Sequence, residues 1–296
     1  MSVALLIGST GQLGSDLHRV LEQDGASVLT PSRETLDVTN HSIVRRFIAE
    51  HRPAVVYNTS AYLRVDDCED DHELAWRVNA YAVRNLAEAC RDAEATLVHF
   101  STDYVFGGDL AQRTPCRETD TPMPVNAYGI TKLSGEHAVR AYCPDHLIVR
   151  SAGLYGLAGS RLKGGSFVET MLRVGRERDE LRVVDDQHLT PTFTRDLAAA
   201  TYNAVAAGAR GTLHITNAGS CSWHEFACAI FELAGIDVTV RPIPSSEYPT
   251  KARRPPYSVM SNERLVQLGV SEPRPWRDAL ASFLEERAGR SASDEH

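Results

Sequence analysis

Val3-Ala-Leu-Leu-Ile7 runs directly into the turn Gly8-Ser-Thr-Gly11-Gln-Leu-Gly14, and a helical pattern over Gly11–Gln23 follows at once. The apolar run predicts a buried strand. Glycines permit a tight turn and let backbone N–H groups approach a pyrophosphate, which the N-terminus of the following helix also attracts. A GxxGxxG turn is a weak signal by itself and can be purely structural. With a strand before it and a helix after it, the turn is typical of the first unit of a dinucleotide-binding fold.

The first 150 residues continue this alternation of short apolar runs with amphipathic segments. Further strands are predicted at 27–29, 54–57, 96–100 and 147–149, and helices at 42–50, 73–92 and 127–141. Such alternation predicts parallel βαβ units. Because the strands are continuous Val, Ile and Leu runs, helices should cover both faces. The expected fold is α/β, a Rossmann-type doubly wound parallel sheet.

The pattern loosens after about residue 150. The stretch 153–166 is rich in Gly and Ser and predicts a loop. Helices are expected near 167–178, 194–207, 223–234 and 275–287, and strands near 181–184, 212–216 and 237–241. We therefore expect a dinucleotide-binding domain over 1–150 and a smaller C-terminal α/β substrate region over 151–290, partly interleaved with the first. Residues 291–296 should form a frayed tail.

Composition limits the classes of function. The chain has 296 residues, with 31 Lys and Arg against 39 Asp and Glu, and a formal net charge of −8. This balance disfavours nucleic-acid and anionic-membrane partners, but a few local arginines can still hold an anionic small molecule. No run approaches the roughly 18 apolar residues of a membrane span, and a signal peptide is not evident. The 6 cysteines lack metal-site spacing, so we expect reduced thiols in a cytoplasmic protein and no metal site.

The end of the second predicted strand bears on the choice of cofactor. NAD would require a ribose-binding carboxylate about 20 residues after the turn. The sequence there is instead Thr30-Pro-Ser-Arg33, without an acid. Arg33 can pair with a 2′-phosphate, which favours NADPH, or it can be a solvated loop charge, which leaves NADH open. Asp37 is a candidate acceptor for the adenine amino group or, equally, a cap of the next helix.

Tyr128-Gly-Ile-Thr-Lys132 has the Tyr-x-x-x-Lys spacing. In a helix this spacing places both side chains on one face, about 5–6 Å apart at Cβ. An adjacent ammonium favours a phenolate, so Lys132 is expected to lower the pKa of Tyr128. Tyr128 would then give a proton to a substrate oxygen as a hydride arrives at carbon, and Lys132 would also hold the nicotinamide ribose.

The segment Ser101-Thr102-Asp103-Tyr104 strengthens this interpretation. It follows the fourth predicted strand, at the carboxyl edge where doubly wound sheets bind ligands. A hydroxyl there can donate to a substrate carbonyl and polarise it, a role that we assign to Thr102.

The whole pattern resembles the extended short-chain dehydrogenase/reductase superfamily and, from Gly8 to about residue 287, the dTDP-4-dehydrorhamnose reductase family. The matching stretches are Gly8–Gly14, Leu36–Thr39, Asn58–Tyr62 with Val65 and Asp66, Val78–Ala80, Ser101–Phe106, Asn126–Lys132, Val184–Gln187, Thr190–Thr192, Ser222–Trp223 and Arg253–Pro255.

The resemblance implies an oxidoreductase that reduces a 4-keto-6-deoxy sugar nucleotide with a nicotinamide cofactor, most closely dTDP-4-dehydrorhamnose to dTDP-L-rhamnose. Thr102, Tyr128 and Lys132 fall on the family's catalytic positions. The candidate cofactor-binding residues are Gly8, Thr10, Gly11, Gln12, Leu13, Arg33, Asp37, Val38, Ala61, Tyr62, Tyr128 and Lys132. The candidate substrate-binding residues are Thr102, Asp103, Tyr104, Arg253 and Arg254.

Arg253 or Arg254 is assigned to the substrate diphosphate from charge and position, and the alternative is a surface basic pair. Family members also suggest a homodimer and an Mg²⁺ requirement, for which the sequence offers no ligands that we can place. Dehydratases of the superfamily typically have the motif Thr-Asp-Glu after the fourth strand. Here Tyr104 takes the place of the Glu, so the acid that drives elimination is missing.

Two positions depart from the family pattern. Leu63 replaces a usual Thr, and Gly153 replaces a usual Trp that lies against the sugar. A hole beside the hexose is therefore expected, next to a longer 159–165 segment, and a related deoxysugar nucleotide is an alternative substrate. A further alternative is a non-catalytic regulatory subunit that binds a sugar nucleotide or NADP. The β subunit of methionine adenosyltransferase resembles such a member of this superfamily. The presence of both Tyr128 and Lys132 argues against that alternative.

Overall fold

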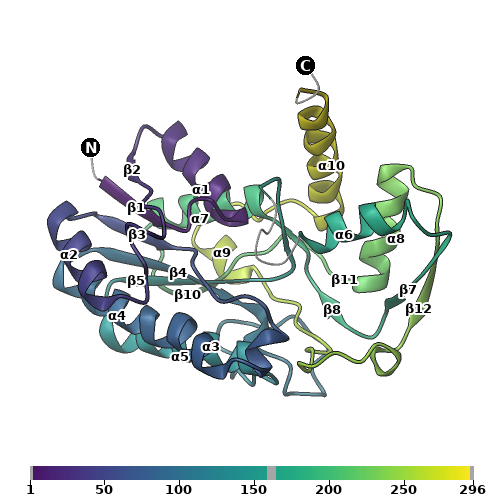
Figure 1. The fold of residues 1–296 in the computed structure, drawn as a ribbon, viewed down its shortest axis with the longest axis horizontal. Helices are drawn as coiled ribbons and strands as arrows, with labels where there is room; N and C mark the ends of the chain where they lie inside the picture. Colours follow the sequence, from purple (N-terminus) through teal and green to yellow (C-terminus); the bar gives the residue numbers. More distant parts are fainter. Residues whose placement is uncertain (1–2, 159–164, 294–296) are drawn as a thin grey trace.

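A six-stranded parallel sheet forms the centre of the computed structural model, which describes residues 3–158 and 165–293 (Figure 1). Its strands are β1 (Val3–Ile7), β2 (Ser27–Leu29), β3 (Val55–Asn58), β4 (Thr96–Thr102), β5 (His146–Ser151) and β10 (Gly211–His214). Their spatial order is β10-β5-β4-β3-β1-β2. The direction of winding reverses beside β1, and doubly wound sheets bind ligands at such a switch point. The predicted α/β doubly wound sheet is confirmed.

Helices cover both faces of the sheet (Figure 1). One face carries α1 (Gln12–Gln23) and α7 (Thr194–Ala206), and the other carries α2 (His41–His51), α4 (Ala82–Asp92) and α5 (Ala127–Tyr142). Strand side chains alternate between the faces.

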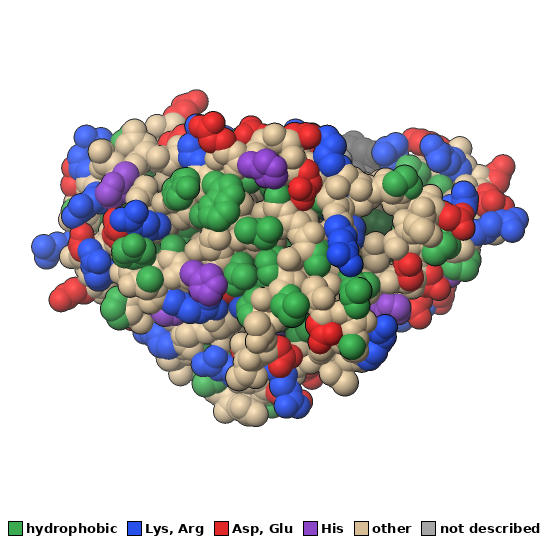
Figure 2. All heavy atoms as spheres, turned by 90° about the horizontal axis from the view of Figure 1, so that it is seen from below, with side chains coloured by type: hydrophobic (Ala, Val, Ile, Leu, Met, Phe, Trp, Pro, Cys, Tyr) green, Lys and Arg blue, Asp and Glu red, His purple; other side chains and the backbone are tan. Residues whose placement is uncertain are grey.

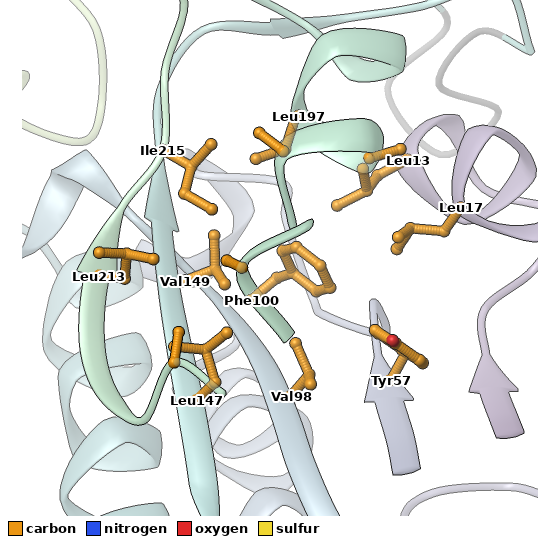
Figure 3. Close-up of a cluster of buried hydrophobic side chains, with 14 of the residues drawn as sticks. Leu13, Leu17, Tyr57, Val98, Phe100, Leu147, Val149, Leu197, Leu213 and Ile215 are labelled. Carbon is orange, nitrogen blue, oxygen red and sulfur yellow. The ribbon is translucent and has the colours of Figure 1, made fainter. Parts of the chain in front are cut away.

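Residues of β1 show this alternation. Leu6 packs with Leu13 and Leu17 of α1, whereas Leu5 and Ile7 join the cluster on the other face. Figure 3 shows the first cluster, with α1 and α7 side chains directed toward those of the strands. Burial of each such leucine stabilises the fold by about 1.5–3 kcal/mol. The strand–turn–helix unit is thereby fixed in place.

The single helix predicted over 73–92 is instead interrupted. It consists of α3 (His72–Trp76), a π turn (Arg77–Tyr81) and α4. The π turn contains Asn79, whose Oδ1 accepts from Tyr62 N and whose Nδ2 donates to Tyr62 O, both at 2.9 Å. The interruption therefore lets one amide side chain hold the loop that follows β3, where two predicted cofactor residues lie.

The C-terminal part forms a smaller lobe and also returns to the main sheet through β10 (Figure 1). The lobe contains α6 (Phe167–Val174), β7 (Glu180–Val184), α8 (Trp223–Ala234), β12 (Thr239–Ile243) and α10 (Trp276–Ser293). Smaller elements are β6 (Leu154–Tyr155), β8 (His188–Leu189), β9 (Thr192–Phe193), β11 (Cys221–Ser222) and α9 (Glu263–Gln267). The β7 and β12 strands pair in parallel, and Ser222 and Glu225 form a capping box at the start of α8.

Several boundaries differ from prediction, and two of them lie in the C-terminal third of the chain. The strand expected at 237–241 lies two residues later, as β12. The predicted start of the frayed tail, residue 291, is too early, because α10 continues through Ser293. Residues 294–296 lie outside the described residues. Positions 159–164 of the segment that we expected to be longer than in relatives are also outside them. Over residues 3–158 and 165–293, no helix combines the length and the apolar character that crossing a bilayer requires.

Candidate active site at the carboxyl edge of the sheet

The glycine turn after β1 is closed by its own backbone. Gly8 has φ +84°, a conformation that favours glycine, and Gly11 N donates to Gly8 O at 3.0 Å. A Cβ on Gly14 would lie 2.1 Å from Gly8 O, and one on Gly8 would lie 2.5 Å from Thr59 Oγ1. Gly11 is the N-cap of α1 and brings no side chain to its N-terminal N–H groups. The turn is a backbone cradle that fits a pyrophosphate.

Gln12 adds a polar group beside this cradle. Its Nε2 is buried and has no hydrogen-bond partner among the described residues. A buried unpaired amide donor is unfavourable unless something accepts from it. This donor is a second sign that the cradle is built for a polar ligand.

We predict that Gly14→Ala weakens NADPH binding at least about tenfold, a loss of about 1.4 kcal/mol. The added methyl group would meet the backbone oxygen of Gly8 and force the turn to open. Fluorescence titration with NADPH measures the effect. Gly289→Ala is a matched control, because a Cβ at that helical position meets nothing within 4 Å. Equal NADPH affinity in the two variants would contradict the cradle assignment.

Arg33 and Asp37 lie together at the end of the sheet near β2. Asp37 Oδ1 accepts from Thr39 N at 2.9 Å and from Thr39 Oγ1 at 2.7 Å. Partial burial opposes ionisation of Asp37, but these hydrogen bonds and the nearby Arg33 outweigh it and lower its pKa. The alternative that Asp37 caps the next helix is wrong, because Asn40 accepts from Ile43 N at the start of α2. The Arg33 side chain is 81% exposed and 3.9 Å from Asp37.

The structure places the remaining cofactor candidates around the same switch point. Thr10 is exposed at the turn, Leu13 is buried under it, and Val38 is half-buried after β2. Ala61 and Tyr62 are half-buried in the loop after β3.

Thr102, Tyr128 and Lys132 meet at the carboxyl edge of β4. Thr102 ends that strand, opposite Ser151 at the end of β5. Asn126 caps α5 by accepting from Gly129 N, and the helix carries Tyr128 and Lys132 one turn apart. A hydrogen bond links the Thr102 hydroxyl to the Tyr128 phenol. The three predicted catalytic residues are therefore brought together.

The expected lowering of the Tyr128 pKa by Lys132 is not observed in the protein by itself. Lys132 is 2% exposed, and its Nζ donates to Phe100 O at 2.7 Å. Burial lowers the pKa of Lys132 to about 8, against a smaller opposing effect of Glu136. Burial raises the pKa of Tyr128 above its ordinary value of 10, although the Thr102 hydrogen bond lowers it somewhat. Tyr128 thus stays protonated at neutral pH, as a proton donor must.

Asp103 and Tyr104 connect the trio to the C-terminal part. Asp103 is buried and accepts from Thr102 Oγ1 at 3.1 Å and from Ser258 Oγ at 2.6 Å. The Tyr104 ring packs edge-on against that of Tyr128, with centroids 5.6 Å apart. Arg254 hydrogen-bonds to the Tyr104 phenol, whose pKa burial raises to about 12. Arg253 is exposed, and only its backbone oxygen joins the site, by accepting from Asn126 Nδ2 at 2.7 Å.

Residues 66–71 form an acidic run before α3. Asp71 accepts from Leu74 N at the start of that helix. Asp66 pairs with Arg254, Asp70 pairs with Lys251, and Glu69 Oε1 accepts from Ala127 N at 2.8 Å. Among residues 3–158 and 165–293, no group of three acidic, His or Cys side chains is arranged to hold a metal.

Residues beyond the predicted set also shape the site. Asn126 stands directly before the Tyr128 helix, which is a recognisable N-cap signal. Asp66 lies in the matched family segment, but its partner is 188 residues away, so no local pattern reveals its role. The same holds for Ser258, which is 155 residues from Asp103.

Gly153 does not open a hole directly beside it. It has φ +54°, and a Cβ there would lie 2.8 Å from Leu189 Cδ1 and 3.1 Å from Pro191 Cα. The space that a side chain at this position would enter is thus already filled. The 189–191 segment packs against Gly153 at the Cβ position, and the hole expected beside the hexose stays a prediction.

On the surface seen in Figure 2, Lys and Arg side chains alternate with Asp and Glu and form no broad basic field. On this face, the net acidic protein thus presents charges of mixed sign.

Comparisons with known proteins agree over nearly the whole chain. A family model described as the RmlD substrate binding domain matches residues 1–288. The chain is 42% identical over 294 residues to dTDP-4-dehydrorhamnose reductase of Streptomyces griseus, covering 97% of this chain and 94% of that protein. It is 42% identical over 282 residues to the probable dTDP-4,6-dihydroxy-2-methyloxan-3-one 4-ketoreductase of Streptomyces antibioticus, covering 93% and 92%. A solved dTDP-4-dehydrorhamnose reductase of Bacillus anthracis str. Ames in complex with NADP is 36% identical, with TM-score 0.91, covering 97% of this chain and 100% of that one.

Proposed function

Because this chain belongs to the dTDP-4-dehydrorhamnose reductase family and matches the model of the RmlD substrate binding domain, we propose that it reduces the C4 keto group of a dTDP-4-keto-6-deoxy sugar. The preferred reaction is dTDP-4-dehydrorhamnose to dTDP-L-rhamnose. One observation carries the proposal: the meeting of Thr102, Tyr128 and Lys132 at the sheet edge, next to an uncapped glycine cradle. That arrangement suits polarisation and protonation of a carbonyl oxygen.

NADPH is the proposed cofactor. The glycine turn fits its pyrophosphate, Asp37 its adenine, and Arg33 a 2′-phosphate. The NADP complex of the Bacillus anthracis relative supports this choice over NADH. When bound, the reduced nicotinamide supplies the hydride. We place no Mg²⁺ in this site.

The chain's own residues handle the substrate oxygen and its proton. The hydroxyls of Thr102 and Tyr128 lie together. When the Thr102 hydroxyl turns its one proton from Asp103 to a bound carbonyl, that oxygen can accept from both. Thr102 polarises the carbonyl, and Tyr128 gives up its proton to the developing alkoxide. The buried ammonium of Lys132, on the same helix face, favours the phenolate that remains and also holds the cofactor ribose.

A second candidate is reduction of a related deoxysugar nucleotide. Leu63 and Gly153 depart from the family pattern, and the Streptomyces antibioticus relative is named for a different ketosugar. The distinguishing experiment follows NADPH absorbance at 340 nm with dTDP-, UDP- and GDP-linked 4-keto-6-deoxy sugars, with NMR of each product. Fastest turnover of dTDP-4-dehydrorhamnose supports the preferred reaction, and fastest turnover of another sugar supports the second candidate. NADPH binding without consumption of any of them would indicate a regulatory subunit.

The cellular setting follows from the thiols. No disulfide bond joins any two of the six cysteines, which are Cys68, Cys90, Cys116, Cys143, Cys221 and Cys228. Thiols that form no disulfide suit a reducing compartment, so we assign the enzyme to the cytoplasm. A homodimer is our proposal for its assembly, and the sedimentation velocity of the purified protein tests it.

A further inference from the structure

The segment 251–258 returns from the C-terminal lobe and attaches to the catalytic edge at several points. The backbone oxygen of Arg253 accepts from Asn126, the cap of the helix that carries Tyr128. Ser258 donates to Asp103, next to Thr102. A shift of this segment would therefore move Asn126 and Asp103, which adjoin the catalytic residues.

Asp66 holds this segment with both oxygens of one carboxylate. Its Oδ1 accepts from Ala252 N at 2.9 Å, and its Oδ2 accepts from Arg254 Nη2 at 2.5 Å. The neighbouring Lys251–Asp70 pair joins the same two segments, but it consists of two exposed side chains and one bond. Exposed single pairs contribute little, whereas bonds to a partly buried guanidinium fix its plane.

Arg254 is held with one guanidinium nitrogen, Nη1, left unpaired in the described part of the chain. Its side chain is 19% exposed, Nη2 is taken by Asp66, and the guanidinium also hydrogen-bonds to Tyr104. Nη1 is buried and has no hydrogen-bond partner among the described residues. The planar guanidinium fork matches phosphate oxygens, and an unpaired N–H of a buried cation is unfavourable unless a ligand accepts from it.

We propose that Asp66 is a positioning residue for the sugar nucleotide: by fixing Ala252 N and Arg254 Nη2, it presents Arg254 Nη1 to an oxygen of the substrate diphosphate. This inference rests on the proposed function and on the prediction from the sequence that Arg253 or Arg254 binds the substrate diphosphate. It selects Arg254 over the exposed Arg253.

The test compares Asp66→Asn with Asp70→Asn, which removes the same charge four residues away. The probe is dTDP, titrated by calorimetry in the presence of saturating NADP⁺. Loss of a negative charge near an anion site should by itself tighten dTDP binding slightly. Loss of positioning should instead weaken it. We expect Asp66→Asn to raise the Kd of dTDP about tenfold, and Asp70→Asn to change it less than about twofold.

Turnover provides a second readout. KM for the sugar nucleotide should rise about as much as the Kd in Asp66→Asn, with kcat and NADPH affinity nearly unchanged. Thermal unfolding checks the fold, and Asp66→Ser carries the same expectation if the Asn variant does not fold.

The outcomes separate the inference from the function beneath it. Equal or tighter dTDP binding by folded Asp66→Asn overturns the positioning role. If Arg254→Ala weakens dTDP binding while Asp66→Asn does not, only the positioning role fails. If Arg254→Ala also leaves the Kd unchanged, the assignment of the substrate diphosphate to Arg254 fails with it, whereas the proposed reduction is tested separately by turnover.

Discussion

Tyr128→Phe is expected to lower kcat about 10²–10⁴-fold, the usual contribution of a positioned general acid. The variant removes the one phenol that hydrogen-bonds to Thr102 and lies on the face of α5 that carries Lys132. The ring that packs against Tyr104 remains, so the fold and the glycine cradle should be intact. NADPH affinity should therefore stay nearly unchanged. Single-turnover rates with dTDP-4-dehydrorhamnose and NADPH fluorescence titration measure the two quantities.

Tyr142→Phe is the matched control, because Tyr142 ends the same helix and contacts Arg84 away from the site. It should retain the full rate. If Tyr128→Phe keeps more than about a tenth of the rate, Tyr128 is not the acid, and Tyr104 becomes the next phenol to replace.

Glu136→Gln is expected to lower the free energy of unfolding by about 3–5 kcal/mol. The Glu136 and Arg150 side chains are 0% and 1% exposed, and Arg150 Nε and Nη2 donate to the carboxylate at 2.8 and 2.7 Å. Ser101 and Arg140 donate to it as well, at 2.6 and 2.8 Å. Without the carboxylate charge, Arg150 is left buried and uncompensated. Urea unfolding followed by circular dichroism measures the loss.

The acid limb of stability should change with it. Burial would raise the pKa of Glu136, but the hydrogen bonds and charge of Arg150 outweigh burial and lower it. A lowered folded-state pKa gives stability that is present above the unfolded value, about 4.3, and is lost as pH falls through the folded value. Glu136→Gln should therefore lose stability less steeply below pH 4.

Glu50→Gln is the control, because its i,i+4 pair with Arg46 is exposed on both sides. It should cost less than about 0.5 kcal/mol. A loss of similar size in the two variants would show that the buried pair contributes no more than an exposed one. Replacing Glu136 and Arg150 together with Leu and Met should recover much of the loss, because no fully buried charge is then left unpaired and Arg140 is partly exposed to solvent.

Local patterns in the sequence predicted much of the fold. The first strand and α8 have the predicted bounds, and α2 exceeds its predicted range by one residue at each end. These elements are specified by apolar periodicity, capping residues and glycines, which act over a few positions. The π turn at Arg77–Tyr81 was missed, and the contact of its Asn79 with Tyr62 is tertiary, so no local pattern reveals it.

In the candidate site, too, local patterns predict some features and miss others. Thr102, Tyr128 and Lys132 follow from motif spacing and the geometry of parallel strands. Their electrostatics do not, because the pKa of Tyr128 depends on burial, and the ammonium of Lys132 is directed at Phe100 O by the packing of α5 on β4. The contact of Asp66 with Arg254 joins residues 188 apart, which no local pattern specifies.

The proposed reduction is tested most directly by finding which carbon of the product carries the transferred hydrogen. The purified protein is incubated with dTDP-4-dehydrorhamnose and NADPH deuterated at the transferring position of nicotinamide C4, and the product is examined by NMR. The proposed reduction places one deuterium at C4 of the hexose, and Tyr128→Phe should give no labelled product on the same timescale. A product without deuterium at C4, or one labelled at another carbon, would contradict the proposed reduction of the C4 keto group.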